Sequence, residues 1–276
     1  SKIKELPLDP LADTHTSQEF AHLWLQYGEG LADILYENPA FEDRVILESG
    51  HYRVRLAKNI SDMEKVLGLR FQAYASIGWI APFNPKAALQ SYLNWEVPDK
   101  YESSAKVLIL EYDKKMVGTV RLIAEDSALG IPATEAYGSN TMRHFADRHF
   151  LVEISRLCIA PQHRNSFAMI NLVGGVYAFG KELEAEHGRM AFAFEADPEK
   201  TVELYAKVGS KSTDIIMPHP SVGVDLELMV WKLEETTPRY QERWERDRIV
   251  KPSSISHDIY DLRLESALWQ KAPAVV

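Results

Sequence analysis

The alternation of apolar and polar residues through the middle of the chain predicts a sheet whose strands are interrupted by helices. Short runs that are apolar or alternate with period two are typical of strands. They occupy residues 51–57, 105–112, 116–124, 151–160, 189–196, 212–218 and 224–233. Asp113, Lys114 and Lys115 separate the second run from the third and indicate a hairpin.

Apolar residues spaced three or four positions apart predict the helices. One covers residues 166–186, and its apolar stripe contains Phe167, Ile170, Val173, Val176, Tyr177 and Leu183. Over 17–37 we expect one helix with Ser17 as N-cap, or two helices broken near Gly28 and Gly30. Another helix is expected from the capping-box pattern at 61–64 to about residue 77. Another is expected over 198–208, between Pro198 and Gly209. Residues 125–149 are polar and irregular, with room for a short helix.

These elements follow the order β-α-loop-β-β-β-α-β-α-β-β. The alternation of strands and helices in the second half predicts an α/β (α+β) protein with a mixed, partly parallel sheet flanked by helices. Sheets of this kind bind ligands at the carboxyl ends of their strands. We expect an N-terminal helical extension over 1–49, a main domain over 50–235, and a C-terminal extension over 236–276 that packs on this domain as a helix plus extended chain.

Composition and charge narrow the class of protein. The chain has 276 residues, of which 46% are hydrophobic, enough for a sizeable core. Its net charge of −9 disfavours general binding to nucleic acid. No apolar run approaches the roughly 20 residues that span a bilayer, and the first residues lack the apolar core of a signal peptide. Because a single cysteine also excludes an internal disulfide, we expect a cytoplasmic protein.

The strand over 151–160 carries Glu153 and Arg156 in an otherwise apolar run. Charges in a core are costly unless they are paired with each other or used by the protein. A regular strand would point these two side chains to opposite faces, whereas a bulge would turn both towards one cleft. They are therefore either a structural ion pair or part of a site. The loop 161–164 leads into a helix N-terminus, an arrangement that favours phosphate.

Two segments resemble the GNAT superfamily of N-acyltransferases. "RLCIAPQHR" (156–164) resembles the superfamily's strand and pantetheine loop, and "ELYAKVGS" (203–210) resembles the end of a later helix that carries a tyrosine. The superfamily has a bulge in this strand. The resemblance covers residues 50–233 and implies the GNAT fold, with Tyr205 protonating the departing thiolate.

The resemblance extends further to acyl-homoserine-lactone (autoinducer) synthases and long-chain N-acyl amino acid synthases. Four motifs occur in their order: Arg70, Tyr74 and Trp79 (RxxxF…W), Asp99 with Glu102 in place of a second aspartate (DxxD), 118–122 (GxxRL), and 153–156 (ExSR). The expected activity is transfer of a fatty acyl group from a carrier-protein or CoA thioester to a small amine.

The resemblance also implies residue roles. Catalytic roles fall to Glu153, Ser155 and Tyr205, with Glu153 as general base and the backbone of the bulge as oxyanion site. The residues implied for substrate binding are Arg70, Tyr74, Trp79, Asp99, Glu102, Arg121 and Arg156. Those implied for the donor are Cys158, Ile159, His163, Arg164, Asn165, Ser166 and Phe167. Ordinary alternatives remain: Tyr205 as an amphipathic helix residue, Asp99 and Glu102 as solvated loop charges, and Arg70 and Arg121 as surface residues.

The loop departs from the superfamily in a way that concerns the donor. Phe167 and Met169 stand where glycines normally let the backbone approach the CoA pyrophosphate. This departure favours acyl carrier protein as donor. The basic cluster of Arg143, His144, Arg148, His149, Arg156, His163 and Arg164 is either a solvated face or a docking patch for that acidic protein or for CoA phosphates.

No tightly bound cofactor is expected, and the acyl-phosphopantetheine thioester is a co-substrate. The nine histidines show no metal-ligand spacing, so no metal site is predicted, and Cys158 is expected to be a small buried hydrophobe. Two alternative functions stay open. One is an acetyl-CoA-dependent GNAT acetyltransferase, and the other is a degenerate acyl-binding or regulatory module. The sequence leaves the acyl length, the amine and the oligomeric state undetermined.

Overall fold

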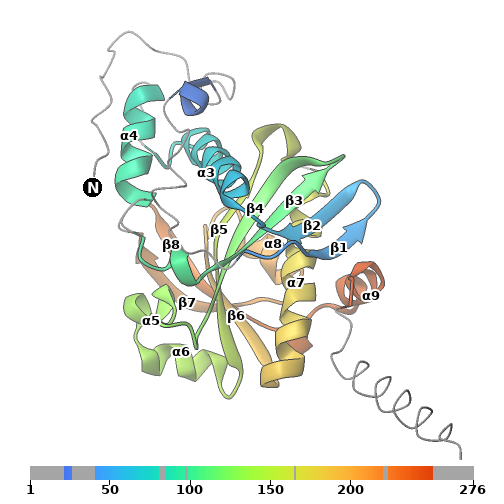
Figure 1. The fold of residues 1–276 in the computed structure, drawn as a ribbon. Coiled ribbons are helices and arrows are strands. Elements are labelled where there is room, and N and C mark those ends of the chain that lie inside the picture. The colour runs from blue at the N-terminus through green and yellow to red at the C-terminus, as the bar shows by residue number, and fades with distance from the viewer. Residues whose placement is uncertain are drawn as a thin grey trace, which may run out of the picture.

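A single mixed sheet organises the described part of the chain, which in this computed structural model comprises residues 22–26, 41–80, 85–96, 99–164, 166–219 and 223–250. Its strand order is β1-β2-β3-β4-β5-β6-β8-β7 (Figure 1). Neighbouring strands are antiparallel except β5 and β6, which are parallel. The strands are β1 (Val45–Ser49), β2 (Tyr52–Leu56), β3 (Lys106–Tyr112), β4 (Lys115–Ala124), β5 (Phe150–Ile159), β6 (Met190–Ala196), β7 (Lys211–Pro218) and β8 (Asp225–Lys232).

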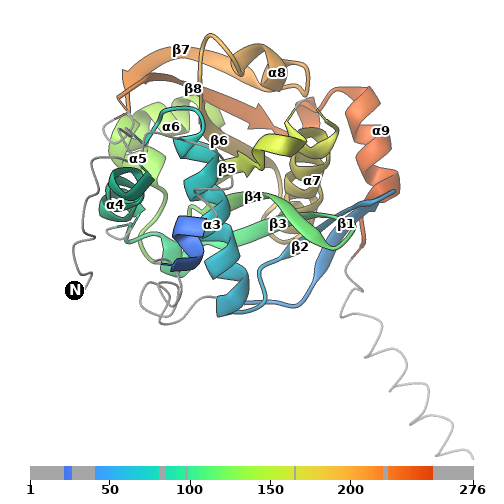
Figure 2. The same cartoon turned by 90° about the horizontal axis from the view of Figure 1, so that it is seen from above.

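Helices cover both faces of the sheet, as the view from above shows (Figure 2). Helix α7 packs on one face, whereas α3 packs on the other, where α5 and α6 also lie. The helices are α3 (Ile60–Ala75), α4 (Pro85–Glu96), α5 (Pro132–Tyr137), α6 (Ser139–Ala146), α7 (Ala168–His187), α8 (Val202–Ala206) and α9 (Pro238–Asp247). The predicted mixed, partly parallel sheet flanked by helices is confirmed.

Strand alternation explains how the core divides. In β3, Leu108 and Leu110 pack in the cluster that contains α7, while Val107 and Ile109 pack in the cluster that contains α3. Successive side chains of a strand point to opposite faces, so one apolar strand supplies both layers. On α7, a Cβ added to Gly175 would lie 2.4 Å from Val54 of β2, so glycine permits the close approach of this helix to the sheet.

Several boundaries differ from the prediction. The N-cap of α3 is Asn59, whose side chain accepts from the backbone N–H of Asp62 at 2.9 Å, so the predicted cap at Ser61 is wrong. Helix α8 starts at Val202 rather than at Pro198, because residues 198–201 form turns held by Asp197. Strand β1 and helix α4 were not predicted, and two helices, α5 and α6, form within 125–149.

The chain beyond the main domain contributes to the core at both ends. In the helical turn 22–26, Leu23 and Trp24 are buried against α3. Strand β1 lies within the expected N-terminal extension and pairs with β2, so the sheet begins before residue 50. In α9, Trp244 is buried with its ring 5.4 Å from that of Tyr177 on α7. The rest of the expected helix 17–37 and the chain after 250 lie outside the described residues.

In the described ranges, none of the helices combines the length and apolar character needed to cross a bilayer.

Candidate active site

A cavity opens where the two parallel strands separate. The pairing of β5 with β6 runs from Phe150 opposite Met190 to Glu153 opposite Ala193, and within the described strands it stops there. Past this point both strands line a cavity of about 970 Å³, to which α3, α5 and α8 also contribute side chains. The cavity lies at the carboxyl ends of the parallel pair, where ligands of such sheets are expected to bind.

The predicted bulge is present in β5. Arg121 of β4 faces Ser155 and Thr119 faces Cys158, so β5 has one residue more than β4 between these pairs. Arg156 has a φ of 55°, a left-handed conformation that non-glycine residues seldom adopt. As a result, Glu153 and Arg156 both line the cavity instead of pointing to opposite faces.

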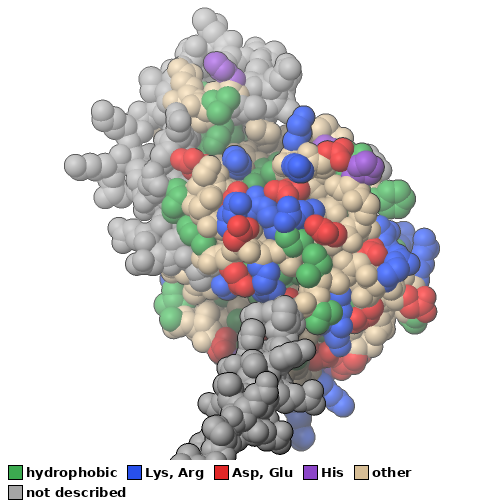
Figure 3. All heavy atoms as spheres, turned by 45° about the vertical axis from the view of Figure 1, so that its right-hand side comes forward, with side chains coloured by type: hydrophobic (Ala, Val, Ile, Leu, Met, Phe, Trp, Pro, Cys, Tyr) green, Lys and Arg blue, Asp and Glu red, His purple; other side chains and the backbone are tan. Residues whose placement is uncertain are grey.

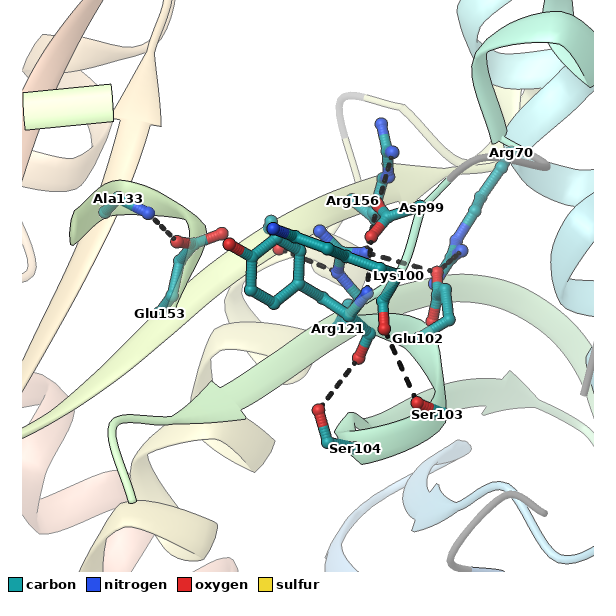
Figure 4. Close-up of polar contacts among 12 residues, drawn as sticks. Arg70, Asp99, Lys100, Glu102, Ser103, Ser104, Arg121, Ala133, Glu153 and Arg156 are labelled. Carbon is teal, nitrogen blue, oxygen red and sulfur yellow. Dashed lines mark hydrogen bonds and ion pairs between the residues drawn. The ribbon is translucent and has the colours of Figure 1, made fainter. Parts of the chain in front are cut away.

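Glu153 is buried, and its carboxylate accepts a hydrogen bond from the backbone N–H of Ala133 at 2.6 Å (Figure 4). Burial raises the pKa of Glu153 to about 7, although the charge of Arg121, the Ala133 N–H and the Ser155 hydroxyl all oppose the rise. A carboxylate that titrates near neutral pH can take up and release protons under working conditions. Its partner is Ala133, while Arg156 binds elsewhere, so these contacts differ from the structural ion pair that was considered.

Next to Glu153 lies a cluster of three arginines and two carboxylates (Figure 4). Asp99 Oδ2 accepts from Arg121 Nη1 at 2.5 Å and from Arg156 Nη2 at 2.9 Å. Burial would raise the pKa of Asp99, but the charges of these two arginines outweigh it and hold the pKa at about 2. Arg121 also donates through Nε to Ser155 Oγ at 3.0 Å, which orients the hydroxyl beside Glu153. Asp99 and Arg121 are therefore not solvated surface groups.

Arg70 and Glu102 belong to this cluster but lie on its side away from the cavity. The two form an ion pair of 2.5 Å, and Arg121 Nη1 is 3.5 Å from the same Glu102 oxygen. Arg70 is fully buried and Glu102 is 6% exposed. Neither residue lines the cavity, unlike Asp99, Arg121 and Arg156. The expectation that Arg70 and Glu102 contact the substrate is therefore not supported by the geometry, which gives them a supporting position.

The remaining predicted site residues approach the cavity from other elements. Tyr205 of α8 lines it and packs edge-on against Phe194, with ring centroids 4.7 Å apart. Burial raises the pKa of Tyr205, so its hydroxyl stays protonated at neutral pH. Tyr74 and Trp79 stack at 5.8 Å and line the cavity near α3. Cys158 is buried, as expected, and also lines the cavity.

The loop between β5 and α7 only partly matches the prediction. Ile159, His163, Arg164 and Ser166 line the cavity, while Asn165 lies outside the described residues. Phe167 does not belong to the inward stripe of α7: its side chain is 67% exposed and lies beneath Arg243, 5.8 Å from the ring centroid. It precedes the first helical residue, Ala168, so its place in the predicted apolar stripe is wrong.

The predicted basic cluster does not form one face. Arg143 and Arg148 precede β5, whereas His163 and Arg164 follow it, and a ten-residue strand separates the two groups by about 30 Å. Arg143 pairs with Glu125, His149 is buried against Glu234, and Arg164 donates to Ala73 O and Ser76 Oγ of the α3 end. Basic and acidic side chains are also mixed on the face that Figure 3 draws, although no residue of this cluster is labelled there. A docking patch built from all these residues is therefore wrong.

Some cavity residues were not predicted from the sequence. The Ala133 N–H reaches Glu153 because Pro132 starts a helix at that point, within a segment considered irregular. Glu195 and His219 also line the cavity. Glu195 could have been found from strand alternation, because it lies two residues beyond Ala193, the register partner of Glu153.

The fold resembles that of a solved N-acyl amino acid synthase. The structure of FeeM, an N-acyl amino acid synthase from uncultured soil microbes, superposes with a TM-score of 0.52 at 14% identity, over 69% of this chain and 97% of that chain. BjaI, a CoA-dependent acyl-homoserine lactone synthase solved with SAM and isopentyl-CoA, gives a TM-score of 0.46 at 11% identity, over 74% of this chain and 89% of that chain. A comparison with curated proteins found no match.

The sequence itself gives the assignment. Residues 65–232, more than half of the chain, match the family described as N-acyl amino acid synthase FeeM. This span contains the cavity-lining part of β5, the arginine cluster and Tyr205. The chain therefore belongs to the FeeM family of N-acyl amino acid synthases and is an N-acyltransferase with a GNAT-like fold.

Proposed function

We propose that the protein transfers a long fatty acyl group from a phosphopantetheine thioester to the amino group of an amino acid or a similar small amine. The observation that carries this proposal is Glu153, a buried carboxylate with a pKa of about 7 beside two cavity-lining arginines. An amine must lose protons to become acylated, and a base with this pKa is suited to accept them. The family assignment supports the same chemistry.

The geometry supports a role for each neighbouring group. Beyond Glu153 the β6-facing edge of β5 has no described strand partner, so its backbone N–H groups can bind the thioester and its developing oxyanion. The Tyr205 hydroxyl supplies a proton to the departing thiolate. Ser155, held by Arg121, orients the Glu153 carboxylate. Attack by the amine forms the amide bond and breaks the carbon–sulfur bond.

The arginine cluster supports an acceptor that carries a carboxylate. In the described ion pairs, Arg121 and Arg156 bind Asp99, and Arg70 binds Glu102. Arg121 and Arg156 line the cavity and can turn their guanidinium groups to a carboxylate. An amino acid would thus place its carboxylate here and its nitrogen near Glu153.

The size and lining of the cavity favour a long acyl chain over an acetyl group. About 970 Å³ is at the upper end of ligand pockets, and Leu157, Phe194, Leu204, Leu226 and Leu228 are among its apolar lining residues. An acetyl group would leave most of this apolar surface uncovered. The volume therefore disfavours the alternative of an ordinary acetyltransferase.

Mass spectrometry of lipids from cells that overproduce the protein tests the proposal. We expect new N-acyl amino acid species, absent from cells that produce the Glu153→Gln variant. The purified enzyme should then acylate the identified amino acid but use its amide poorly, because the amide lacks the carboxylate for Arg121 and Arg156. Failure to acylate any amine from any long-chain thioester would overturn the proposal.

The loop between β5 and α7 leads to a prediction about which thioester the enzyme prefers as donor. Met169 lines the cavity where glycine is usual, and Ser166 Oγ already accepts the N–H of Ala168 at 3.2 Å, so little backbone remains for a pyrophosphate. Phosphopantetheine on a carrier protein has one phosphate, so we expect kcat/KM to be higher for long-chain acyl carrier protein than for the matching acyl-CoA. Charge reversal at Arg143 or Arg148 should change neither value. Equal or better use of acyl-CoA would contradict the preference.

A conservative change tests the proton donor. Tyr205→Phe removes one hydroxyl and keeps the ring against Phe194, so we expect kcat to fall while the KM for the donor changes little. Single-turnover measurement of free thiol and amide reports the chemical step directly. A large rise in the donor KM at unchanged kcat would instead make Tyr205 a binding residue.

A further inference from the structure

The proposed reaction removes two protons from the nitrogen of the acceptor, and Glu153 alone can accept only one of them at a time. Amino groups have pKa values of about 8 to 10, so the acceptor arrives mostly as an ammonium ion at neutral pH. Its nitrogen must lose two protons before the amide is formed. One of them balances the proton given to the thiolate, and the other goes to solvent. Glu153 is buried and can hold only one proton at a time.

Glu195, on β6, places a second carboxylate in the cavity that Glu153 lines. Ala193 is the parallel register partner of Glu153, and Glu195 follows it by two residues on the same face of the sheet. One strand spacing and two residues place the Cα atoms of the two glutamates at least about 8 Å apart. Both side chains line the cavity, so a small amine can lie between their carboxylates.

The surroundings of Glu195 hold its carboxylate in place while leaving it in contact with solvent. Tyr137 of α5 donates to Glu195 Oε1 at 2.7 Å, and His219 Nε2 lies 3.8 Å from Oε2. The Glu195 side chain is 33% exposed, whereas Glu153 is buried. Burial lowers the pKa of His219, with Arg156 acting in the same direction and Glu195 opposing it, so the imidazole is mostly neutral at pH 7.

We propose that Glu195 is a second carboxylate of the amine subsite, which binds the ammonium form of the acceptor and takes its first proton. This inference rests on the proposed function and adds a catalytic residue to it. Glu195 contacts Tyr137 and His219, and Glu153 and Arg156 line the same cavity. Of the two carboxylates Glu195 is the more exposed, so it can pass a proton to water.

Glu195 and Glu153 together accept the two protons that the acceptor nitrogen loses. The ammonium ion gives one proton to Glu195, which frees the lone pair on nitrogen for attack on the thioester carbon. The tetrahedral adduct gives its second nitrogen-bound proton to Glu153. Collapse breaks the carbon–sulfur bond, and the thiolate takes the proton of the Tyr205 hydroxyl. Glu153 returns one proton to Tyr205 through the site, and Glu195 releases the other to solvent.

The test compares wild type and Glu195→Gln with two kinds of acceptor across pH. With a primary amine acceptor of pKa near 10, we expect the variant to lose roughly 10²-fold in kcat/KM for the acceptor at pH 7. This loss should shrink as pH rises towards the pKa of the amine, because the acceptor then arrives already neutral. With an aromatic amine or a hydrazide, whose pKa is below about 6, the two enzymes should differ by less than about threefold.

Two further variants distinguish a role of Glu195 in proton transfer from a non-specific effect of substitution on the structure. Glu199→Gln removes the same charge four residues later, from an exposed side chain outside the cavity lining, and should behave as wild type. Tyr137→Phe removes the hydrogen bond to Glu195 and should give a smaller loss with the same dependence on amine pKa. The KM of the donor should stay constant in all three variants.

Three results would overturn the inference. One is an unchanged kcat/KM of Glu195→Gln with the high-pKa amine. Another is an equal loss with both kinds of amine, which would indicate a packing role. A wild-type enzyme that acylates no amine would overturn the proposed function and this inference together, whereas the first two results leave the proposed function standing.

Discussion

Replacing Glu153 by glutamine is expected to slow acyl transfer by about 10²- to 10⁴-fold, the usual contribution of a positioned general base. Glutamine keeps the shape of the side chain and can still accept from the Ala133 N–H. It cannot take a proton from the amine. In wild type, kcat/KM should rise with pH through about 7 as Glu153 ionises, and this rise should vanish in the variant. Near-normal turnover of a folded variant would exclude Glu153 as the base.

The same substitution has a stability signature that verifies folding. Because the pKa of Glu153 is raised from its ordinary 4.5 to about 7, the folded state binds this proton more tightly than the unfolded state does. Its contribution to stability is complete below pH 4.5 and is lost as pH rises through 7. That loss amounts to about 3 kcal/mol at 1.36 kcal/mol per pKa unit. Urea unfolding should therefore show equal stability of both proteins near pH 4.5 and a more stable Glu153→Gln variant at pH 8.

The fold was largely predictable because most of its strands are short runs that are either apolar throughout or alternate with period two. In β3 and β5 apolar residues occupy the positions that the sheet buries, so the strands were found close to their true bounds. The N-cap of α3 was missed because Ser61 and Asn59 are both suitable capping residues. Only the backbone angles, extended at Asn59, decide between them. Phe167 was misplaced since periodicity continues across a helix start, where the side chain is no longer directed inward.

The candidate site was predictable only where local sequence carries it. The bulge and the cavity-facing Glu153 follow from one strand and its resemblance to a superfamily. The partners of these residues do not, because they come from distant segments. Arg70 and Glu102 are 32 residues apart, and nothing in either segment indicates that they pair. The basic cluster failed for the opposite reason: residues close in sequence are separated by the length of β5.

Arg70 leads to the second large expected effect, on stability and not on substrate affinity. Its guanidinium is fully buried and pairs with Glu102 at 2.5 Å, and neither side chain lines the cavity. The charges of Arg70, Arg121 and Arg156 lower the pKa of Glu102 against the effect of burial, so this carboxylate is charged at neutral pH. Arg70→Met would leave a buried negative charge whose remaining described ion-pair partner, Arg121, is 3.5 Å away.

Breaking a buried ion pair from one side costs about 3–5 kcal/mol, so we expect Arg70→Met to lower the free energy of unfolding by that amount. The double variant Arg70→Met/Glu102→Gln should recover most of the loss, since glutamine is neutral and the unpaired charge is gone. Urea unfolding of wild type, Arg70→Met, Glu102→Gln and the double variant at pH 7 gives the coupling energy of the pair. Any Arg70→Met protein that remains folded should keep a near-normal acceptor KM. An unchanged stability together with a raised acceptor KM would contradict this structural role and indicate that Arg70 binds the substrate.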